Sequence, residues 1–179
     1  MGATTTMVTV QEFLQLPEPE GQRMELIGGE VVTMSFGKLR HEIVKKNLIR
    51  ILVVWLSQNP IGEVFAETMF QLDEFNSFIP DLSVVFPSRI DLSTDWIHGA
   101  PEIAVEVVSS ETAATLERKI DLYLAHGSKS VWVVFPEYRR IRIFDAAGGS
   151  KRFEQHQILE DPTVLPGFST PVSAIFAGI

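Results

Sequence analysis

A carboxylate inside an apolar strand is the feature that most restricts how this chain can fold. Glu106 lies between Val105 and Val107 in the run EIAVEVVSS. A β-branched run of this kind is typical of a buried strand. A carboxylate in such a strand is costly unless something positive lies beside it. The sequence therefore predicts either a structural ion pair at Glu106 or a site that holds a cation.

A second acid, Asp81, opens the apolar run PDLSVVF. Taken alone, an aspartate after Pro80 is commonly a turn residue. Because Asp81 and Glu106 each adjoin a predicted buried strand, two acids that share one cation explain both positions at the lowest cost. We therefore expect Asp81 and Glu106 to lie close together.

A lysine on a predicted helix extends this cluster. The apolar spacing of Leu116, Ile120 and Tyr123 predicts a helix over residues 115–126, and Lys119 falls on the edge of its inward face. Its ammonium group either extends outward to solvent or reaches the strand that carries Glu106. Carboxylate ligands in a chain without cysteine favour Mg²⁺ or Mn²⁺. Two carboxylates, a divalent ion and a lysine suit hydrolysis of a phosphodiester.

Length and composition indicate one soluble α/β domain over residues 1–179. The 179 residues are long enough for one core, and 45% of them are hydrophobic. The absence of cysteine favours a reducing compartment, so we expect a cytoplasmic protein. No apolar run approaches the roughly 20 residues that a membrane span needs. A net charge of −8 argues against broad, non-specific nucleic-acid binding but permits a local basic strip.

The order of predicted elements indicates a mixed α/β fold, with a central sheet covered by helices. Thr9 is expected to cap a short helix, and Gly28-Gly29 to form the turn of an N-terminal hairpin. A long helix is expected over residues 41–58, and a C-terminal β-hairpin over residues 139–156, around Gly148-Gly149. Residues 88–101 are expected to be a long loop.

The only dense basic cluster lies around the start of the long helix. It is either a solvated helix face or a track for DNA, and it consists of Lys38, Arg40, Lys45, Lys46 and Arg50.

The sequence resembles the Uma2 (DUF820) family of restriction-endonuclease-like proteins over roughly residues 8–145. The resemblance rests on five segments in the right order: MELIGGEVVTM, RHEIVKKNL, PDLSVVF, APEIAVEVVSSET and ERKIDLYLAHGSKSVWVV. One departure is the segment VVSSET, where the family usually has a proline after the serine. The resemblance implies the PD-(D/E)XK nuclease fold, a mixed sheet flanked by helices.

The resemblance also implies roles for individual residues. Asp81 and Glu106 would be the metal-binding acids, and Lys119 the family lysine, moved onto the helix from the position that Val108 occupies. Glu25 and His41 match two further polar positions near the site. From the residues alone, Glu25 could equally be a hairpin residue paired to a nearby arginine such as Arg23, and His41 a helix-start or core histidine.

These observations lead to one preferred function and one alternative. The preferred function is a Mg²⁺- or Mn²⁺-dependent endonuclease that cleaves nucleic acid, with DNA as the expected substrate, and that acts as a homodimer. The alternative is a nuclease fold that has lost catalysis and serves in binding or assembly. The acidic net charge and the lack of an appended specificity domain favour this alternative.

Overall fold

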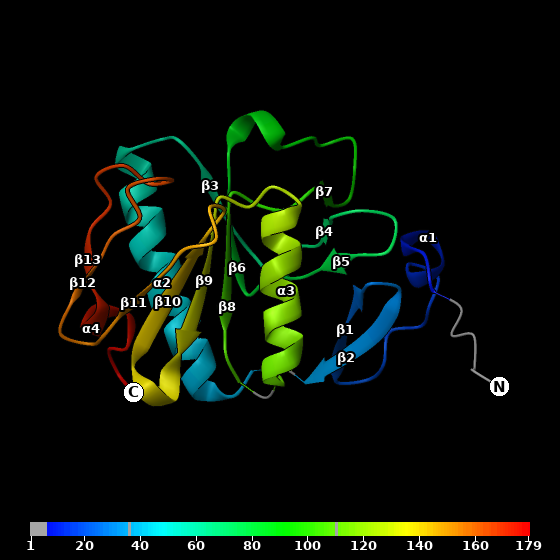
Figure 1. The fold of residues 1–179 in the computed structure, drawn as a ribbon, viewed down its shortest axis with the longest axis horizontal. Helices are drawn as coiled ribbons and strands as arrows, with labels where there is room; N and C mark the ends of the chain where they lie inside the picture. The colour runs from blue at the N-terminus through cyan, green and yellow to red at the C-terminus, as the bar shows by residue number, and fades with distance from the viewer. Residues whose placement is uncertain (1–6, 36, 110) are drawn as a thin grey trace.

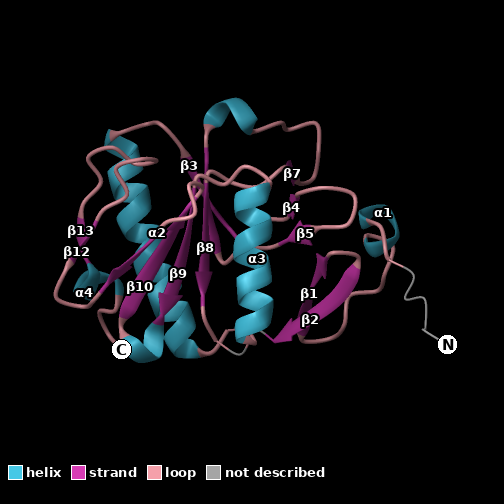
Figure 2. Cartoon of the chain, in the orientation of Figure 1, coloured by secondary structure: helices cyan, strands magenta, loops and turns pink. Residues whose placement is uncertain are grey.

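The structure is a computed structural model that describes residues 7–35, 37–109 and 111–179. It has the mixed α/β architecture expected from the sequence, with helices packed on strands (Figures 1 and 2). None of the helices in the described ranges has the length and apolar character needed to cross a bilayer.

The larger of the two main sheets has six strands within the described residues, in the order β11–β10–β9–β8–β6–β3. Strands β8 and β9 are parallel, and the other neighbours in this sheet are antiparallel. The long crossover between β8 and β9 is helix α3, as a parallel pair requires. The strands are β3 (Glu63–Ala66), β6 (Leu82–Val85), β8 (Ile103–Val107), β9 (Ser130–Phe135), β10 (Arg140–Asp145) and β11 (Ser150–Phe153).

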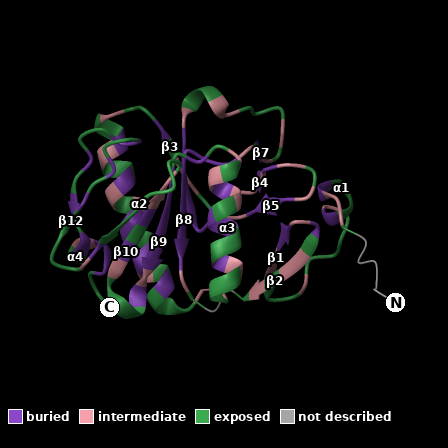
Figure 3. Cartoon of the chain, viewed as in Figure 1, coloured by how far each residue is buried: buried purple, intermediate pink, exposed green. Residues whose placement is uncertain are grey.

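The two faces of this sheet carry different side chains, because successive residues of a strand point to opposite sides. In β8, Val105 and Val107 pack in the core beneath α2 (Leu39–Gln58), whereas Ala104 faces the core beneath α3 (Ala113–Ala125). Glu106 points to the same side of β8 as Ala104, toward α3. Figure 3 shows the strands of the large sheet as buried (purple) and the outer faces of the helices as exposed (green). A carboxylate is thus placed on the face that α3 covers.

A second sheet, not expected from the sequence, has five strands among the described residues, in the order β2–β1–β5–β4–β7. The predicted N-terminal hairpin forms two of them, and its turn uses Gly28 and Gly29 at φ values of 59° and 76°. The other three are two-residue strands. Such strands give almost no periodic signal, and β7 lies inside the segment expected to be a loop. The strands are β1 (Gln22–Ile27), β2 (Glu30–Ser35), β4 (Phe70–Gln71), β5 (Ser77–Phe78) and β7 (Ile97–His98).

The predicted helices form, although their ends differ from the prediction. Helix α2 begins at Leu39 and α3 at Ala113, each two residues before the expected start. Thr9 caps a single turn, α1 (Val10–Phe13), in a capping box with Glu12. Two short 3₁₀ turns, η1 (Pro87–Arg89) and η2 (Pro136–Tyr138), follow β6 and β9.

The C-terminal segment returns to α2 and covers part of it. Strands β12 (Ile158–Leu159) and β13 (Thr170–Pro171) pair, and α4 (Val172–Ile175) follows directly. Asn47, buried on α2, donates through Nδ2 to the carbonyls of Ile175 at 3.0 Å and Ala177 at 2.9 Å. One amide therefore attaches the C-terminal segment to the long helix.

We predict that Asn47→Ala lowers the free energy of unfolding by about 1–3 kcal/mol, because two carbonyl groups lose their donor. Asn47→Asp should cost at least as much, because a carboxylate cannot donate to either carbonyl. Urea denaturation measures both losses. A matched control is Asn59→Ala, which removes an amide that donates to the carbonyl of Trp55 at the end of α2. Equal stability of the Asn47 variants and wild type would contradict the proposed attachment.

Candidate functional site

The pairing of β6 with β8 brings the two predicted acids to one end of the sheet. Leu82 lies opposite Val105 in this antiparallel pair, so the residue before Leu82 lies beside Glu106. That residue is Asp81, whose Oδ2 accepts a hydrogen bond of 2.8 Å from the backbone N–H of Val107. The starts of α2 and α3 and the end of β2 lie at the same edge of the molecule (Figure 1).

The ammonium group of Lys119 joins three elements at this edge. Its Nζ lies 2.8 Å from Glu106 Oε1 on β8 and 2.9 Å from Glu25 Oε2 on β1. Lys119 is 1% exposed and Glu25 0% exposed, so water does not screen these ion pairs. Of the two predicted orientations of Lys119, the inward one is therefore confirmed. Glu25 pairs with Lys119, as its predicted position near the site requires.

His41, near the start of α2, contacts Asp81, the second predicted acid. Its Nε2 lies 3.1 Å from Oδ2 of Asp81, and both side chains are buried. A Cβ atom at Gly37 would lie 2.3 Å from Nδ1 of His41, so only glycine leaves room for the ring here. The imidazole is thus placed by both its helix and the backbone beside it.

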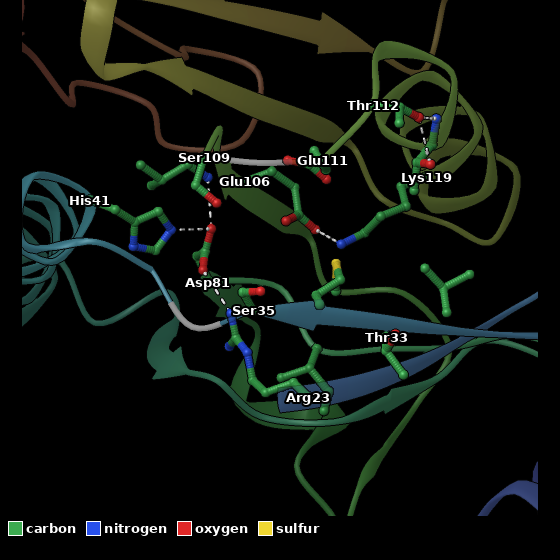
Figure 4. A pocket seen from close by; sticks show the side chains of 15 residues that line it. Arg23, Thr33, Ser35, His41, Asp81, Glu106, Ser109, Glu111, Thr112 and Lys119 are labelled. Carbon is green, nitrogen blue, oxygen red and sulfur yellow. Dashed lines mark hydrogen bonds and ion pairs between the residues drawn. The ribbon is translucent and has the colours of Figure 1, made fainter. Parts of the chain in front are cut away.

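These side chains border one cavity, which we call the acidic cavity (Figure 4). Its volume is about 370 Å³. Glu25 lies behind Lys119 and does not border it. The remaining predicted site residues border it, together with polar groups that were not predicted; the polar lining is Arg23, Thr33, Ser35, His41, Asp81, Glu106, Ser109, Glu111, Thr112, Thr115 and Lys119.

Sequence reasoning missed several contributors. The hydroxyl of Tyr123 donates to Glu106 Oε1 at 2.8 Å, although the sequence indicated only an inward apolar role for this residue. Its position four residues after Lys119, on the same helix face, was the available signal. Arg23 reaches Asp81 Oδ1 at 3.6 Å and Glu67 at 3.2 Å. No pattern in the sequence indicates this contact.

The pKa shifts reflect burial of several acids around few cations. Burial raises the pKa of Glu106, Lys119 lowers it, and the net result is a pKa of about 8. Burial alone would lower the pKa of Lys119, but the surrounding carboxylates outweigh it and raise that pKa, so the group stays an ammonium. Burial would likewise lower the pKa of His41, yet its bond to Asp81 raises it overall.

The pKa of Asp81 shifts the other way from that of Glu106. Burial would raise it, but the hydrogen bond and charge of His41 and the Val107 N–H lower it overall. The pKa of Glu111 is raised, mainly by its burial. Asp81 is therefore an anion at neutral pH, whereas Glu106 is mostly protonated there and ionises as the pH rises through about 8.

The acidic cavity offers oxygen atoms that suit a divalent cation. The contacts from Lys119 and Tyr123 both use Oε1 of Glu106, and its other oxygen lies on the Asp81 side in Figure 4. In the described ranges, no group of three or more His, Cys, Asp or Glu side chains is arranged to hold a metal. Two carboxylates with several waters are nevertheless a common Mg²⁺ environment. Asp81 and Glu106 are therefore the residues that could hold such an ion.

The basic cluster around α2 does not form one face. Lys45 is buried and pairs with Glu42 and Glu67, both at 2.9 Å, so it takes part in neither a solvated face nor a DNA track. The other members are exposed: Lys38, Arg40, Lys46 and Arg50.

Fold and site together define a protein of the restriction-endonuclease-like nuclease fold. A crystal structure of "a putative nuclease belonging to DUF820" from Anabaena variabilis matches with a TM-score of 0.83 at 21% identity, over 95% of this chain and 98% of that one. The profile of the Uma2 family, described as "Putative restriction endonuclease", matches residues 10–173. The chain belongs to the Uma2 family.

A relative from Synechocystis, "Uncharacterized protein sll1609", is 27% identical over 114 residues. The match covers 62% of this chain and 64% of that protein, which is less than two thirds of its length.

We predict that Lys119→Met lowers the free energy of unfolding by about 3–5 kcal/mol, because the buried acidic groups of Glu25 and Glu106 lose the cation that both of them contact. Chemical denaturation at pH 7 measures the loss. Lys46→Met is the control, since the same change on the exposed side of α2 should have little effect. A Lys119→Met protein as stable as the control would show that the ion pairs contribute little.

Glu106→Gln should stabilise the protein increasingly as the pH rises from about 5 to 8.5. The folded-state pKa of Glu106, about 8, lies above its ordinary value of 4.5. Its contribution to stability is therefore fully present below the ordinary pKa and is lost as the pH rises through about 8. Glutamine stays neutral throughout. Thermal unfolding of both proteins across this range tests the prediction, and a difference that does not change with pH would contradict it.

Proposed function

We propose that this protein is a metal-dependent endonuclease that hydrolyses phosphodiester bonds in DNA. The observation that carries the proposal is the meeting of Asp81, Glu106 and Lys119 at one cavity, with His41 and Glu25 supporting them. Membership of the Uma2 family supports the same class of activity.

Each residue has a distinct part in this proposal. Asp81 and Glu106 would hold Mg²⁺ or Mn²⁺, which when bound polarises the phosphate and lowers the pKa of a coordinated water. His41 and the Val107 N–H orient the Asp81 carboxylate. Glu25 and Tyr123 act indirectly: Glu25 positions Lys119, and Tyr123 positions Glu106.

Lys119 serves as a cation in this proposal and not as a base. Its raised pKa keeps the proton on Nζ at every pH at which the protein would work. A fixed ammonium group at the wall of the cavity stabilises negative charge that develops on a phosphate. It also holds Oε1 of Glu106, which leaves the second oxygen to face the cavity.

Cleavage of plasmid and single-stranded DNA with Mg²⁺ or Mn²⁺ tests the proposal. Asp81→Asn and Glu106→Gln keep the shape of each side chain and should reduce cleavage at least about a hundredfold. Glu102→Gln is the matched control, because this buried acid lies at the opposite end of β8, where it binds Arg89 and the Phe86 N–H. Cleavage that survives equally in all three variants would contradict the assignment.

Metal binding is measured separately from catalysis by thermal shift. Wild type should gain stability as Mn²⁺ is added, because a ligand that binds only the folded state stabilises it. Asp81→Asn should lose this gain, and Glu102→Gln should keep it.

A second candidate, a nuclease fold that binds or assembles without cleaving, is favoured by one observation. Among the described residues, no three His, Cys, Asp or Glu side chains are grouped so that they could hold a metal ion together. An equal background of cleavage in wild type and variants, with no thermal shift in Mn²⁺, would support this candidate. The homodimer and the cytoplasmic location stay predictions. Analytical ultracentrifugation tests the first.

A further inference from the structure

Two further cavities lead away from the acidic cavity across the surface, one after the other. The first, here the aromatic pocket, has a volume of about 270 Å³ and shares His41 and Ser109 with the acidic cavity. Its lining is Lys38, Arg40, His41, Val108, Ser109, Phe135, Pro136, Glu137 and Tyr138. The second, here the arginine groove, has a volume of about 340 Å³ and shares Phe135 with the aromatic pocket. It is lined by Phe135, Arg140, Arg142, Ser150 and Arg152.

The arginine groove concentrates positive charge in an acidic protein. Arg142 lies directly opposite Arg152 in the pairing of β10 with β11, and like charges opposite each other destabilise a sheet. Arg152 has one acidic partner, Glu154 at 2.8 Å. Within the described part of the chain, no carboxylate lies within ion-pair distance of Arg140 or Arg142. An unfavourable arrangement of this kind suits a polyanion that neutralises it.

The aromatic pocket presents a ring at the surface beside this charge. Tyr138 is 63% exposed, and the guanidinium of Arg140 lies 4.6 Å from the centre of its ring. Arg139, between them, has a φ of 46°, a conformation that is costly for residues other than glycine and concentrates at functional sites. This backbone turn directs Tyr138 and Arg140 to the same side. A flat exposed ring next to cations is suited to stacking with an unpaired base.

The groove and the acidic cavity lie on one face of the large sheet. Val133 pairs with Glu106 on one side and with Arg142 on the other, so the three side chains point to the same side. Phe135, two residues further along β9, connects the groove to the aromatic pocket. A strand of nucleic acid bound in the groove would therefore lead past Tyr138 to His41 and Asp81.

We propose that the arginine groove and the aromatic pocket form a binding track for single-stranded nucleic acid. Arg140, Arg142 and Arg152 contact successive phosphates, and an unpaired base stacks on Tyr138 before the chain enters the acidic cavity. This proposal rests on the proposed nuclease function and names its substrate as an unpaired strand. The exposed members of the α2 cluster that border the pocket, Lys38 and Arg40, extend the track at its inner end.

Binding of a fluorescent oligothymidylate in EDTA, followed by anisotropy, tests the track without requiring cleavage. The double variant Arg142→Ala/Arg152→Ala should weaken binding and reduce the slope of log affinity against log salt by about 0.7 for each phosphate that is no longer neutralised. Tyr138→Ala should weaken binding about tenfold and leave this slope unchanged, because stacking releases no counter-ions. Tyr138→Phe should retain the wild-type affinity.

The charge-matched control is Lys129→Ala/Lys151→Ala. It removes two exposed lysines outside the arginine groove, one of which lies on the opposite face of β11. Equal weakening in the arginine and lysine variants would overturn the track, whether or not the wild type cuts DNA. Tighter binding of a duplex than of the single strand, with no effect of Tyr138→Ala, would overturn the stacking of an unpaired base. Loss of cleavage in Asp81→Asn with unchanged binding would leave the track intact.

Discussion

The buried ammonium of Lys119 is the interaction on which the arrangement of this protein depends. It contacts a carboxylate from each of the two sheets, Glu25 on β1 and Glu106 on β8, and it belongs to the helix between them. Neither acid would be tolerated at such depth without a cation. The relative position of the two sheets is therefore coupled to the geometry of the acidic cavity.

Within the described part of the chain, the same cluster holds more acidic side chains than basic ones, because only Lys119, Arg23 and His41 face its four acids. Asp81, Glu106 and Glu111 border the cavity, and Glu25 lies just behind it. The raised pKa of Glu106 expresses this imbalance, since Lys119 does not fully offset the burial and the neighbouring acids. Sites in which stability is reduced in this way are commonly functional, because groups selected for chemistry are seldom optimal for folding. A divalent cation would correct the imbalance.

Much of the fold and part of the site could be predicted from the sequence, for identifiable reasons. Glu106 within a valine run is a strong signal, because few environments accept it, and the periodicity of α2 and α3 spans several turns. The second sheet could not be predicted in the same way. Strands such as β4, β5 and β7 have two residues each, and their pairing is decided by contacts between distant segments. The contact between Arg23 and Asp81 was not predicted for the same reason. The arginine groove depends on the register of β10 with β11, which puts Arg142 opposite Arg152, and composition alone does not reveal that register.

The long separation in sequence between Lys119 and Glu25 has a consequence for biosynthesis. Glu25 and Lys119 are separated by 94 residues, so a ribosome must synthesise that whole stretch before the ammonium group can meet the carboxylate of Glu25. Until then Glu25, on the hairpin of β1 and β2, lacks its buried cation, and this ion pair cannot hold the hairpin against α3. A nascent polypeptide in which Lys119 has not yet been synthesised therefore lacks an assembled acidic cavity.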